Sequence, residues 1–457
     1  MELNPELPKN GKNLLINTFK GISGKRVPWV PFAGIHAGKL VGYDATEVLT
    51  DSERLKKALI EVIKLYRPDG MPITFDLQLE AEILGCNLMW DKKAPPSVKA
   101  HPLAEKKEIP TRLPEPEDGR FPVVLEVMEY MSKNFGNEVA FFGLVTGPLT
   151  LASHLRGTDF FMDMIEDPEY ASSLLEYAKN VALQVKDFYI EAGMDVIAVV
   201  DPLVSQVSPR HFKKFLLTLY SEIFAEIRNE GYFSAFFVCG DASKNIEVMC
   251  QSKPDAIFVD ENVNMKEAKI ICGKYEITLG GNIPLTTIML YGTQQDNMKY
   301  VVDMLDSLDN NQLIIAPGCD MPYDTPPENA IAVQQAIKET ETVRKMLKDY
   351  TKVEEAEIDI ELPDYSNLEK PLVEVFTLDS ATCAACTYMV SVAHVAKKHY
   401  GERIDVVEYK FSELEGIKRI KKMGVEKLPS IYINGKLKFS SIIPCKEELF
   451  AEIDKVL

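Results

Sequence analysis

The chain has 457 residues, 46% of them hydrophobic and 26% charged, which is the composition of a globular protein with room for more than one hydrophobic core. Its net charge of −18 would repel nucleic acid and anionic membrane surfaces, so we expect small molecules and other proteins as partners. The first residues are polar and no long apolar run follows them, so we expect neither secretion nor membrane insertion, and a cytoplasmic location.

Short β-type runs alternate with amphipathic helical stretches, such as 52–66 and 209–229, through most of the chain. The β-type runs fall at 29–34, 70–75, 138–145, 195–200, 234–238, 256–259, 276–280 and 313–316. Repeated βα units of this number predict an α/β fold, a (β/α)8 TIM barrel over residues 1–345 with an excursion rich in Pro and Lys at 87–120. An open doubly wound sheet is the alternative.

A second, smaller α/β domain is expected at residues 371–457. The preceding segment, 346–370, has eight acidic residues and three lysines, a net charge of −5, and we expect it to be an acidic linker. The C-terminal pattern reads β-α-β-α-β-β-α, with Cys383-Ala-Ala-Cys386 at the start of its first helix and Pro429 before its third strand. Over about 85 residues this order resembles thioredoxin and glutaredoxin.

The C-x-x-C motif suits thiol–disulfide exchange. A thiolate at a helix N-terminus is stabilised by unpaired N–H groups, so Cys383 is the expected attacking thiol and Cys386 the resolving thiol. The resemblance implies that the peptide bond before Pro429 is cis and that this proline holds a thiol partner beside the disulfide. A metal-chaperone motif and two structural cysteines are the alternatives. The other cysteines of the chain are too widely spaced for a disulfide framework.

Three β-type runs of the barrel end in a thiol or a carboxylate. Cys239 follows 234–238, Asp260 and Glu261 follow 256–259, and Cys319 lies shortly after 313–316. Because the carboxyl ends of barrel strands meet at one mouth, we expect these side chains to converge there. Soft sulfur ligands with a carboxylate predict a zinc site. Metal-free thiols, or two buried cysteines without chemistry, are the alternatives.

The sequence around these cysteines resembles the zinc methyltransferases of the uroporphyrinogen decarboxylase superfamily, which include methanol- and methylamine-linked coenzyme M methyltransferases. The matching segments are 237–241, 317–319, 80–85, 146–152, 191–195, 281–284 and 325–329. The resemblance implies Zn²⁺ held by Cys239, Glu261 and Cys319. The family motif has a histidine two residues before the first cysteine, where this chain has Phe237, so His36 is considered as a further ligand.

The resemblance also implies the chemistry. Bound Zn²⁺ removes the proton of a substrate thiol near neutral pH and leaves a thiolate that is still nucleophilic. The expected methyl donor is methylcobalamin carried by a separate corrinoid protein, and the expected acceptor is a small thiol. Transfer in the reverse direction would use the same site.

Polar residues at other strand ends are candidates for substrate binding. They are Asp76 and Glu80 after the second run, Asp201 after the fourth, Asn282 after the seventh, and His154 and His36 on neighbouring segments. Each has a structural alternative, because Asp and Asn commonly cap helices and a histidine is often a core or surface residue.

Two other functions compete with thiol methylation. The protein could be a thiol–disulfide oxidoreductase whose barrel only binds the substrate. Uroporphyrinogen decarboxylase activity is less consistent with the sequence, because the segment around His36 has no arginine and Cys319 stands where that enzyme has a histidine. The fused C-terminal domain suggests two roles, either to keep the barrel cysteines reduced or to reduce a disulfide form of the methyl acceptor.

Overall fold

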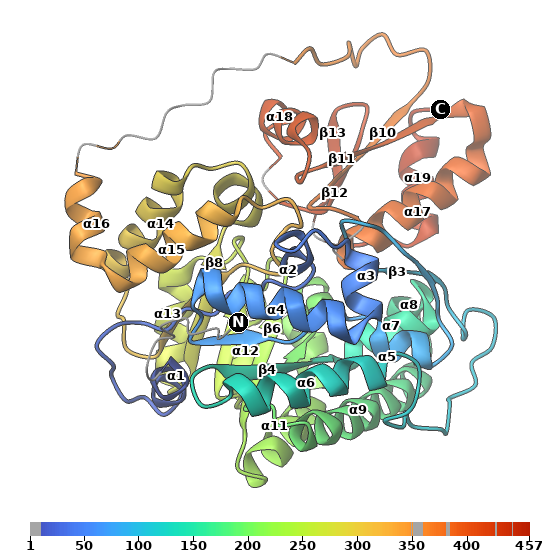
Figure 1. Ribbon diagram of the computed structural model, residues 1–457. Coiled ribbons are helices and arrows are strands. Elements are labelled where there is room, and N and C mark those ends of the chain that lie inside the picture. Colours follow the sequence, from blue (N-terminus) through green and yellow to red (C-terminus); the bar gives the residue numbers. More distant parts are fainter. Residues whose placement is uncertain (1–10, 349, 351–359, 381–383, 426, 441) are drawn as a thin grey trace. The chain divides into compact units, whose positions relative to one another are not determined.

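The chain divides into two compact units, the first reaching Thr351 and the second running from Lys352 to Leu457 (Figure 1). The computed structural model describes residues 11–348, 350, 360–380, 384–425, 427–440 and 442–457. No helix in this described part is long and apolar enough to cross a membrane. Each unit has its own hydrophobic core.

A curled sheet of parallel strands forms the centre of the first unit. The strands are β1 (Gly70–Pro72), β4 (Ala140–Thr146), β5 (Val196–Val200), β6 (Phe233–Val238), β7 (Ala256–Val259), β8 (Thr278–Ile283) and β9 (Leu313–Pro317), and they neighbour one another in that order. Because every pair is parallel and helices connect successive strands, the unit has the predicted TIM-barrel-like architecture rather than an open doubly wound sheet.

The segment around Trp29 joins the two edges of this sheet. Val30 N–H donates to Ile315 O at 3.0 Å on β9, and the carbonyl of Trp29 accepts from Asp69 N–H at 2.9 Å, next to β1. The expected strand at 29–34 is therefore only an isolated bridge between Trp29 and Ile315. Pro31 lies inside it, and a proline has no N–H to extend a ladder of hydrogen bonds.

The barrel interior is built by side chains at alternate positions along the strands, because successive residues of a strand point to opposite faces. On β6, Ala235 and Phe237 lie in the interior core, whereas Phe236 points outward and its ring packs 4.4 Å from that of Tyr220. β8 continues three residues beyond the expected end at 280. Gly280 fits inside the strand because a side chain there would collide with the ring of Phe258.

Helices surround the strands (Figure 1). They are α1 (Gly11–Phe19), α2 (His36–Lys39), α3 (Ala45–Thr50), α4 (Ser52–Tyr66), α5 (Leu79–Ile83), α6 (Phe121–Phe135), α7 (Pro148–Arg156), α8 (Asp159–Glu166), α9 (Pro168–Glu191), η1 (Pro202–Gln206), α10 (Pro209–His211), η2 (Phe212–Leu216), α11 (Leu217–Asn229), η3 (Ser243–Asn245), α12 (Ile246–Gln251), α13 (Met265–Lys274), η4 (Leu285–Leu290), α14 (Gln294–Ser307), α15 (Pro327–Lys338) and α16 (Thr340–Met346). α4 has the bounds expected from its pattern, and the helix expected at 209–229 contains the π-helical turn η2.

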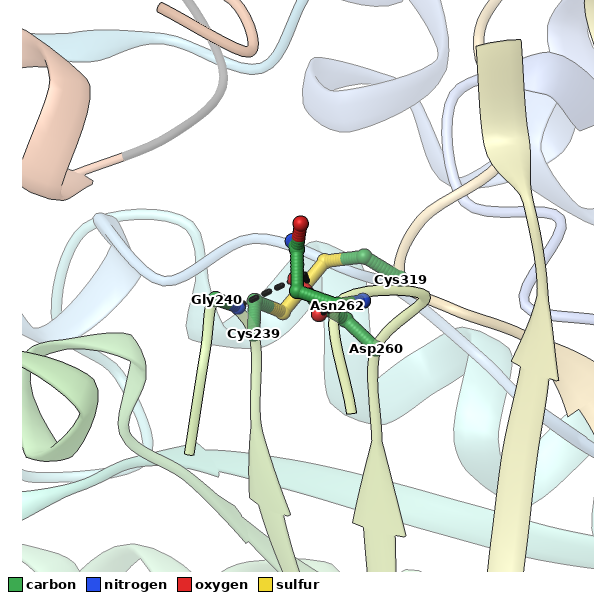
Figure 2. Close-up of a disulfide and its surroundings, with 5 residues drawn as sticks. All are labelled: Cys239, Gly240, Asp260, Asn262 and Cys319. Atoms are coloured by element: carbon green, nitrogen blue, oxygen red, sulfur yellow. Dashed lines mark hydrogen bonds between the residues drawn. A yellow bond between two sulfur atoms is a disulfide. The ribbon is translucent and has the colours of Figure 1, made fainter. Parts of the chain in front are cut away.

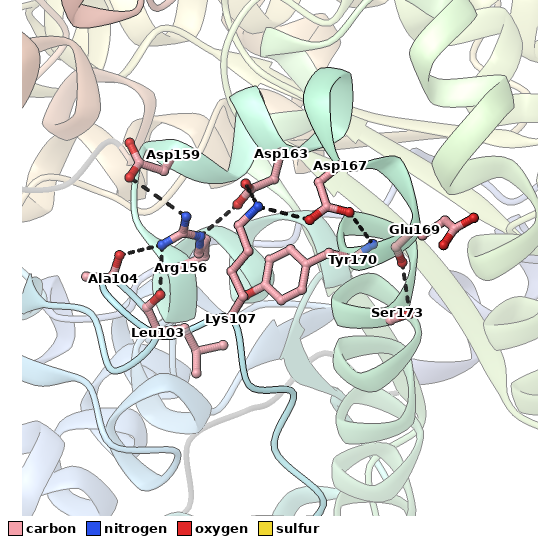
Figure 3. A network of polar contacts seen from close by, with 10 residues as sticks. All are labelled: Leu103, Ala104, Lys107, Arg156, Asp159, Asp163, Asp167, Glu169, Tyr170 and Ser173. Carbon is pink, nitrogen blue, oxygen red and sulfur yellow. Dashed lines mark hydrogen bonds and ion pairs between the residues drawn. The ribbon is translucent and has the colours of Figure 1, made fainter.

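The excursion from the barrel contains a small hairpin of β2 (Asn87–Met89) and β3 (Ser97–Ala100). Beyond β3 it is bound to helices α7 and α8 by a polar network centred on Arg156 (Figure 3). Arg156 donates to Asp163 at 2.7 Å and to the carbonyl of Leu103 at 2.8 Å, and Lys107 pairs with Asp163 at 2.7 Å. The two contacts of Arg156 are buried, and together with the ion pair of Lys107 they fix a segment that has little regular structure of its own.

The second unit has the expected element order. Its strands β10 (Leu372–Thr377), β11 (Asp405–Lys410), β12 (Ser430–Ile433) and β13 (Lys436–Ser440) form a sheet in the order β11-β10-β12-β13. Its helices are α17 (Ala384–Tyr400), η5 (Gly401–Arg403), α18 (Leu414–Met423) and α19 (Lys446–Asp454). α17 and α19 contribute to the core on one face of the sheet, and α18 packs on the other face.

The unit also includes part of the segment expected to be a linker. Tyr365 donates its hydroxyl hydrogen to Glu374 at 2.7 Å, and Arg419 contacts both residues, at 2.5 Å from the Glu374 carboxylate and 3.0 Å from the Tyr365 hydroxyl. Glu374 and Arg419 are buried, so Tyr365 satisfies a charged pair inside this unit.

Candidate active site at the barrel mouth

Cys239 and Cys319 meet at the carboxyl ends of the barrel strands. Cys239 directly follows β6 and has the inward parity of Ala235 and Phe237, while Cys319 lies two residues after β9. The two side chains form a disulfide, with Cα atoms 6.0 Å apart, although 80 residues separate them in the sequence (Figure 2). The structure thus brings the predicted cysteines together, as a bonded pair rather than as two thiolates.

The loop after β7 lies against both cysteine segments. One carboxylate oxygen of Asp260 accepts from Gly240 N–H, and the other accepts from Asn262 N–H at 2.8 Å (Figure 2). On the opposite side, a Cβ atom at Gly318 would lie only 3.0 Å from the nitrogen of Glu261, so the two backbones approach closely here. Asp260 and Glu261 are therefore positioned between the two cysteine segments.

Both carboxyl groups of this loop are costly to ionise. Burial raises the pKa of Asp260 to about 6. Burial, followed by the charge of Asp260, raises the pKa of Glu261 to about 8. Glu261 accepts one hydrogen bond, from Leu285 N–H at 2.6 Å. A bound cation would offset this desolvation cost.

Two cysteines and a nearby acidic loop are donor types that suit a zinc ion. Among the described residues, no three His, Cys, Asp or Glu side chains lie in metal-binding geometry. Two thiolates at about 2.3 Å from one tetrahedral Zn²⁺ would have sulfurs roughly 3.8 Å apart, a separation within reach of this cysteine pair. Soft thiolates and a carboxylate, such as that of Glu261, are the donor types that zinc takes in proteins.

Phe237, which stands where the family motif has a histidine, is part of the barrel core. Phe237 is 1% exposed, and its ring centroid lies 4.8 Å from that of Phe32 and 5.6 Å from that of Phe75. His36 does not replace the histidine. Its Nε2 is bonded to the Tyr66 hydroxyl at 2.6 Å and its Nδ1 to the carbonyl of Tyr323 at 3.0 Å, and burial lowers its pKa to about 4.

Asp201 is bound to the start of α7, and Glu80 is bound to Thr146, the last residue of β4. Asp201 accepts from Leu149 N–H at 2.9 Å, Thr150 N–H at 3.1 Å and the Tyr220 hydroxyl, and thereby caps α7. Burial outweighs these bonds and raises the pKa of Asp201 to about 6. Glu80 accepts from Thr146 N–H at 3.0 Å and from the Thr146 hydroxyl at 2.7 Å, and burial raises its pKa. Asp201 thus caps a helix, which is the structural alternative that the sequence allowed for it. Glu80 is likewise bound to the barrel framework.

Asp76 is paired with an arginine that the sequence did not indicate. Arg120, which is 9% exposed, donates to Asp76 at 2.6 Å and to Glu82 at 2.7 Å. It lies in the excursion expected at 87–120, and no motif in that segment indicates that this arginine pairs with Asp76. Only the fold brings Arg120 to the end of β1.

Asn282 holds the loop that carries Asp260 and Glu261. Its side-chain amide donates to the carbonyls of Asp260 and Val263, both at 2.9 Å, and its Oδ1 accepts from the Tyr300 hydroxyl at 3.1 Å. Tyr300 lies on α14 and was not indicated by the sequence. The structure therefore makes Asn282 a residue that positions the candidate ligand loop.

Two further polar residues of the barrel have shifted pKa values. His154 is buried on α7, and burial lowers its pKa to about 3. Asp320, which follows Cys319, was missed by the sequence reading. One of its carboxylate oxygens, Oδ1, is buried and has no hydrogen-bond partner among the described residues, and burial holds its pKa well above the usual range.

The redox residues of the second unit are partly described. Cys383 lies outside the described residues. Cys386 is buried near the start of α17, and Leu378 N–H donates to its sulfur at 3.3 Å. The peptide bond between Leu428 and Pro429 is cis, as the thioredoxin resemblance implies.

Comparisons with known proteins agree with both units. The uroporphyrinogen decarboxylase (URO-D) family profile matches residues 10–340, and the thioredoxin domain profile matches residues 372–454. A methylcobamide:CoM methyltransferase, MtaA of Methanosarcina barkeri, is 27% identical over 332 residues, which cover 70% of this chain and 95% of that protein. A methylated-thiol–coenzyme M methyltransferase of Methanosarcina mazei is 28% identical over 272 residues, covering 58% and 71%.

A solved structure gives the same result. A methyltransferase from Methanosarcina mazei superimposes with a TM-score of 0.68 at 25% identity, covering 73% of this chain and all of that one. The family profile spans most of the barrel and includes both cysteines of the disulfide. The chain therefore belongs to the uroporphyrinogen decarboxylase family and carries a thioredoxin domain after its barrel.

Proposed function

We propose that this protein is a methyltransferase that moves a methyl group between a corrinoid protein and a small thiol, with Zn²⁺ bound by Cys239, Glu261 and Cys319. The observation that supports this most strongly is the meeting of Cys239, Cys319 and the Glu261 loop at one barrel mouth. Relatives that act on methylcobamide, coenzyme M and methylated thiols support the choice of donor and acceptor.

The residues of the chain have distinct roles in this proposal. Once reduced, Cys239 and Cys319 bind the metal through Sγ, and Glu261 binds it through its carboxylate. Bound zinc supplies a Lewis acid that lowers the pKa of the substrate thiol. Asn282 keeps the Glu261 loop in position through its bonds to the carbonyls of Asp260 and Val263. Phe237, one interior layer below Cys239, excludes water from beneath the site.

Metal content tests the proposal directly. Protein purified under reducing conditions without chelator should carry about one zinc per chain, as expected for a single site. C239S and C319S should each lose most of it, and C445S, which changes a half-buried cysteine of the other unit, should retain it. Methylation of 2-mercaptoethanesulfonate from methylcobalamin should fall in parallel with zinc. Full zinc occupancy and full methylation in C239S would contradict the proposal.

One observation favours a second function. The barrel cysteines form a disulfide, and the same chain carries a thioredoxin domain with a C-x-x-C motif, so a thiol–disulfide oxidoreductase with a substrate-binding barrel is the alternative. We propose that Cys383 attacks and Cys386 resolves in either case. The alternative predicts disulfide reduction without any methylation of a thiol by the zinc-loaded protein.

A further inference from the structure

We propose that Lys338 is an acylation site, at which the side-chain amine takes the acyl group of a small activated donor, such as an acyl phosphate, that enters a cleft at the amino ends of the barrel strands. The cleft lies at the other end of the strands from Cys239 and Cys319, and its lining residues all belong to the first unit. The proposal therefore goes beyond methyl transfer and does not depend on it.

Three segments of the barrel form this cleft, which has a volume of about 840 Å³. Its lining residues come from 18–27, from 305–312 and from 337–344. Residues 309–312 lead directly into β9, whereas Cys319 follows the carboxyl end of the same strand. The volume is typical of pockets that hold small molecules, so a small acyl donor can enter.

Lys338 lines the cleft at the end of α15 and has no acidic partner there. The residue is half-buried, and among the described residues its ammonium makes no ion pair and one hydrogen bond. That bond, to the carbonyl of Arg67, is long at 3.4 Å and is exposed. By contrast, the ammonium of Lys179 on α9 lies 2.6 Å from a carboxylate oxygen of Glu222. The amine of Lys338 is thus open to solvent and weakly held.

The charges around Lys338 favour its neutral form. Burial, together with the positive charges of Arg26 and Arg67, outweighs the nearby carboxylate of Asp69 and lowers the pKa of Lys338 to about 8. Asp69 offers little compensation, because its carboxylate already accepts two hydrogen bonds from Arg26, at 2.6 and 2.7 Å. Only the neutral amine carries the lone pair that attacks an acyl carbon. Lys338 is therefore a nucleophile near neutral pH.

Most of the acidic residues that line the cleft have other partners. Asp306 and Glu341 both pair with Arg344. Glu339 follows Lys338 in the chain, is exposed and forms no ion pair with it. None of these three carboxylates therefore anchors the Lys338 ammonium.

The reaction balances in atoms and electrons. The Lys338 nitrogen attacks the carbonyl carbon of the acyl phosphate and forms a C–N bond, while the bond between that carbon and the bridging phosphate oxygen breaks. Phosphate leaves with the electron pair of that bond, and the amine gives one proton to water. No oxidant or reductant takes part. The product is an amide, so the positive charge beside Arg26 and Arg67 is lost.

Competitive acetylation of the full-length chain tests the proposal. With limiting acetyl phosphate at pH 8, mass spectrometry should show Lys338 acetylated at least about tenfold faster than the exposed Lys57, because about half of the Lys338 amines are neutral, against less than about 1% for a lysine in water. Lys269 is the matched control. It is also half-buried with a lowered pKa, but its ammonium donates to the carbonyl of Gln312 at 2.9 Å and is stabilised by the charge of Asp309, the fourth acid of the cleft. Lys338 reacting no faster than Lys57 or Lys269 would overturn the proposal.

The pH dependence of acetylation gives a second measurement. The rate for Lys338 should rise with pH and level off above about pH 8, where its amine is neutral, whereas the rate for Lys57 should still rise near about pH 10. K338R, which keeps the positive charge, should lose this acetylation and no other. A Lys338 rate that climbs in parallel with that of Lys57 would contradict the proposal. These measurements follow lysine chemistry only, so a failure of methyl transfer would leave their outcome unchanged.

Discussion

At the residue scale, the carboxylates near the barrel mouth differ in the hydrogen-bond and ion-pair partners that offset the cost of their burial. Asp76 is paired with Arg120, while Asp260 is satisfied by backbone N–H groups of the loops around it. Asp320 has one oxygen without a partner among the described residues. The groups with protein partners serve the fold, whereas the carboxyl of Glu261 accepts a hydrogen bond from Leu285 N–H and is the metal ligand of our proposal.

The pair of Arg120 and Asp76 allows a prediction about stability. R120A should lower the free energy of unfolding by about 3 to 5 kcal/mol, because Asp76 and Glu82 would lose a buried counter-charge. Urea denaturation measures this change. K93A, which breaks the exposed pair of Lys93 with Asp324, should leave the free energy of unfolding almost unchanged, because water screens this pair.

A second substitution checks the cause. Adding D76N to R120A should recover part of the loss, because the uncompensated charge is removed along with its partner. If R120A and K93A had equal effects, the buried pair would not be a stabilising contact, and the assignment of Asp76 to the fold would be wrong.

At the element scale, helix α7 depends on a carboxylate from another strand. Its N-terminal N–H groups at Leu149 and Thr150 donate to Asp201, which follows β5. Gly147 precedes the helix, and a side chain there would collide with the Asp201 carboxylate. The connection after β4 and the end of β5 are thus fixed together, and α7 carries the buried His154.

This cap also leads to a prediction. D201A should lower the free energy of unfolding by about 3 kcal/mol, because it leaves buried N–H and hydroxyl donors without acceptors. D167A is the matched control, since Asp167 caps α9 through Tyr170 N–H but its side chain is 43% exposed. Its cost should be clearly smaller than that of D201A, because water can replace the lost acceptor at an exposed helix end. If D201A and D167A lowered the free energy of unfolding equally, burial of the cap would not determine how much it stabilises the protein.

At the scale of the whole molecule, the two units have separate cores. The interior of the barrel is formed by residues of the first unit alone, and the cores on the two faces of the β10–β13 sheet are formed by residues 373–453. The boundary lies before Tyr365, because this residue bonds to the buried Glu374 and Arg419. Independent folding of the second unit is therefore expected.

A pair of truncations tests this boundary. Residues 360–457 expressed alone should unfold cooperatively, with near-native secondary structure by circular dichroism. Residues 371–457 should be less stable by about 1 to 3 kcal/mol, because loss of Tyr365 leaves an oxygen of Glu374 unsatisfied. In the longer fragment, Y365F should reproduce most of that loss. Equal stability of both fragments would place the boundary at 371 instead.

Much of the architecture was predictable because its signals are local. An apolar run with β-type residues predicted β7 at its observed bounds, and helical periodicity predicted α4. The strand expected at 29–34 was shortened to a bridge, because the effect of Pro31 on pairing depends on the neighbouring strands. Arg120 and Tyr300 could not be found, since neither lies in a pattern that indicates its partner.

The sequence by itself determined that a parallel barrel is followed by a thioredoxin-like domain, and that thiols and carboxylates stand at the strand ends. These properties follow from periodicity and from short motifs, which depend on neighbours along the chain. Only the tertiary structure decided which of those groups meet. Cys239 and Cys319 are 80 residues apart and form one pair, whereas Asp201 and Asn282 bind backbone groups, because the closure of the barrel sets the distances between strand ends.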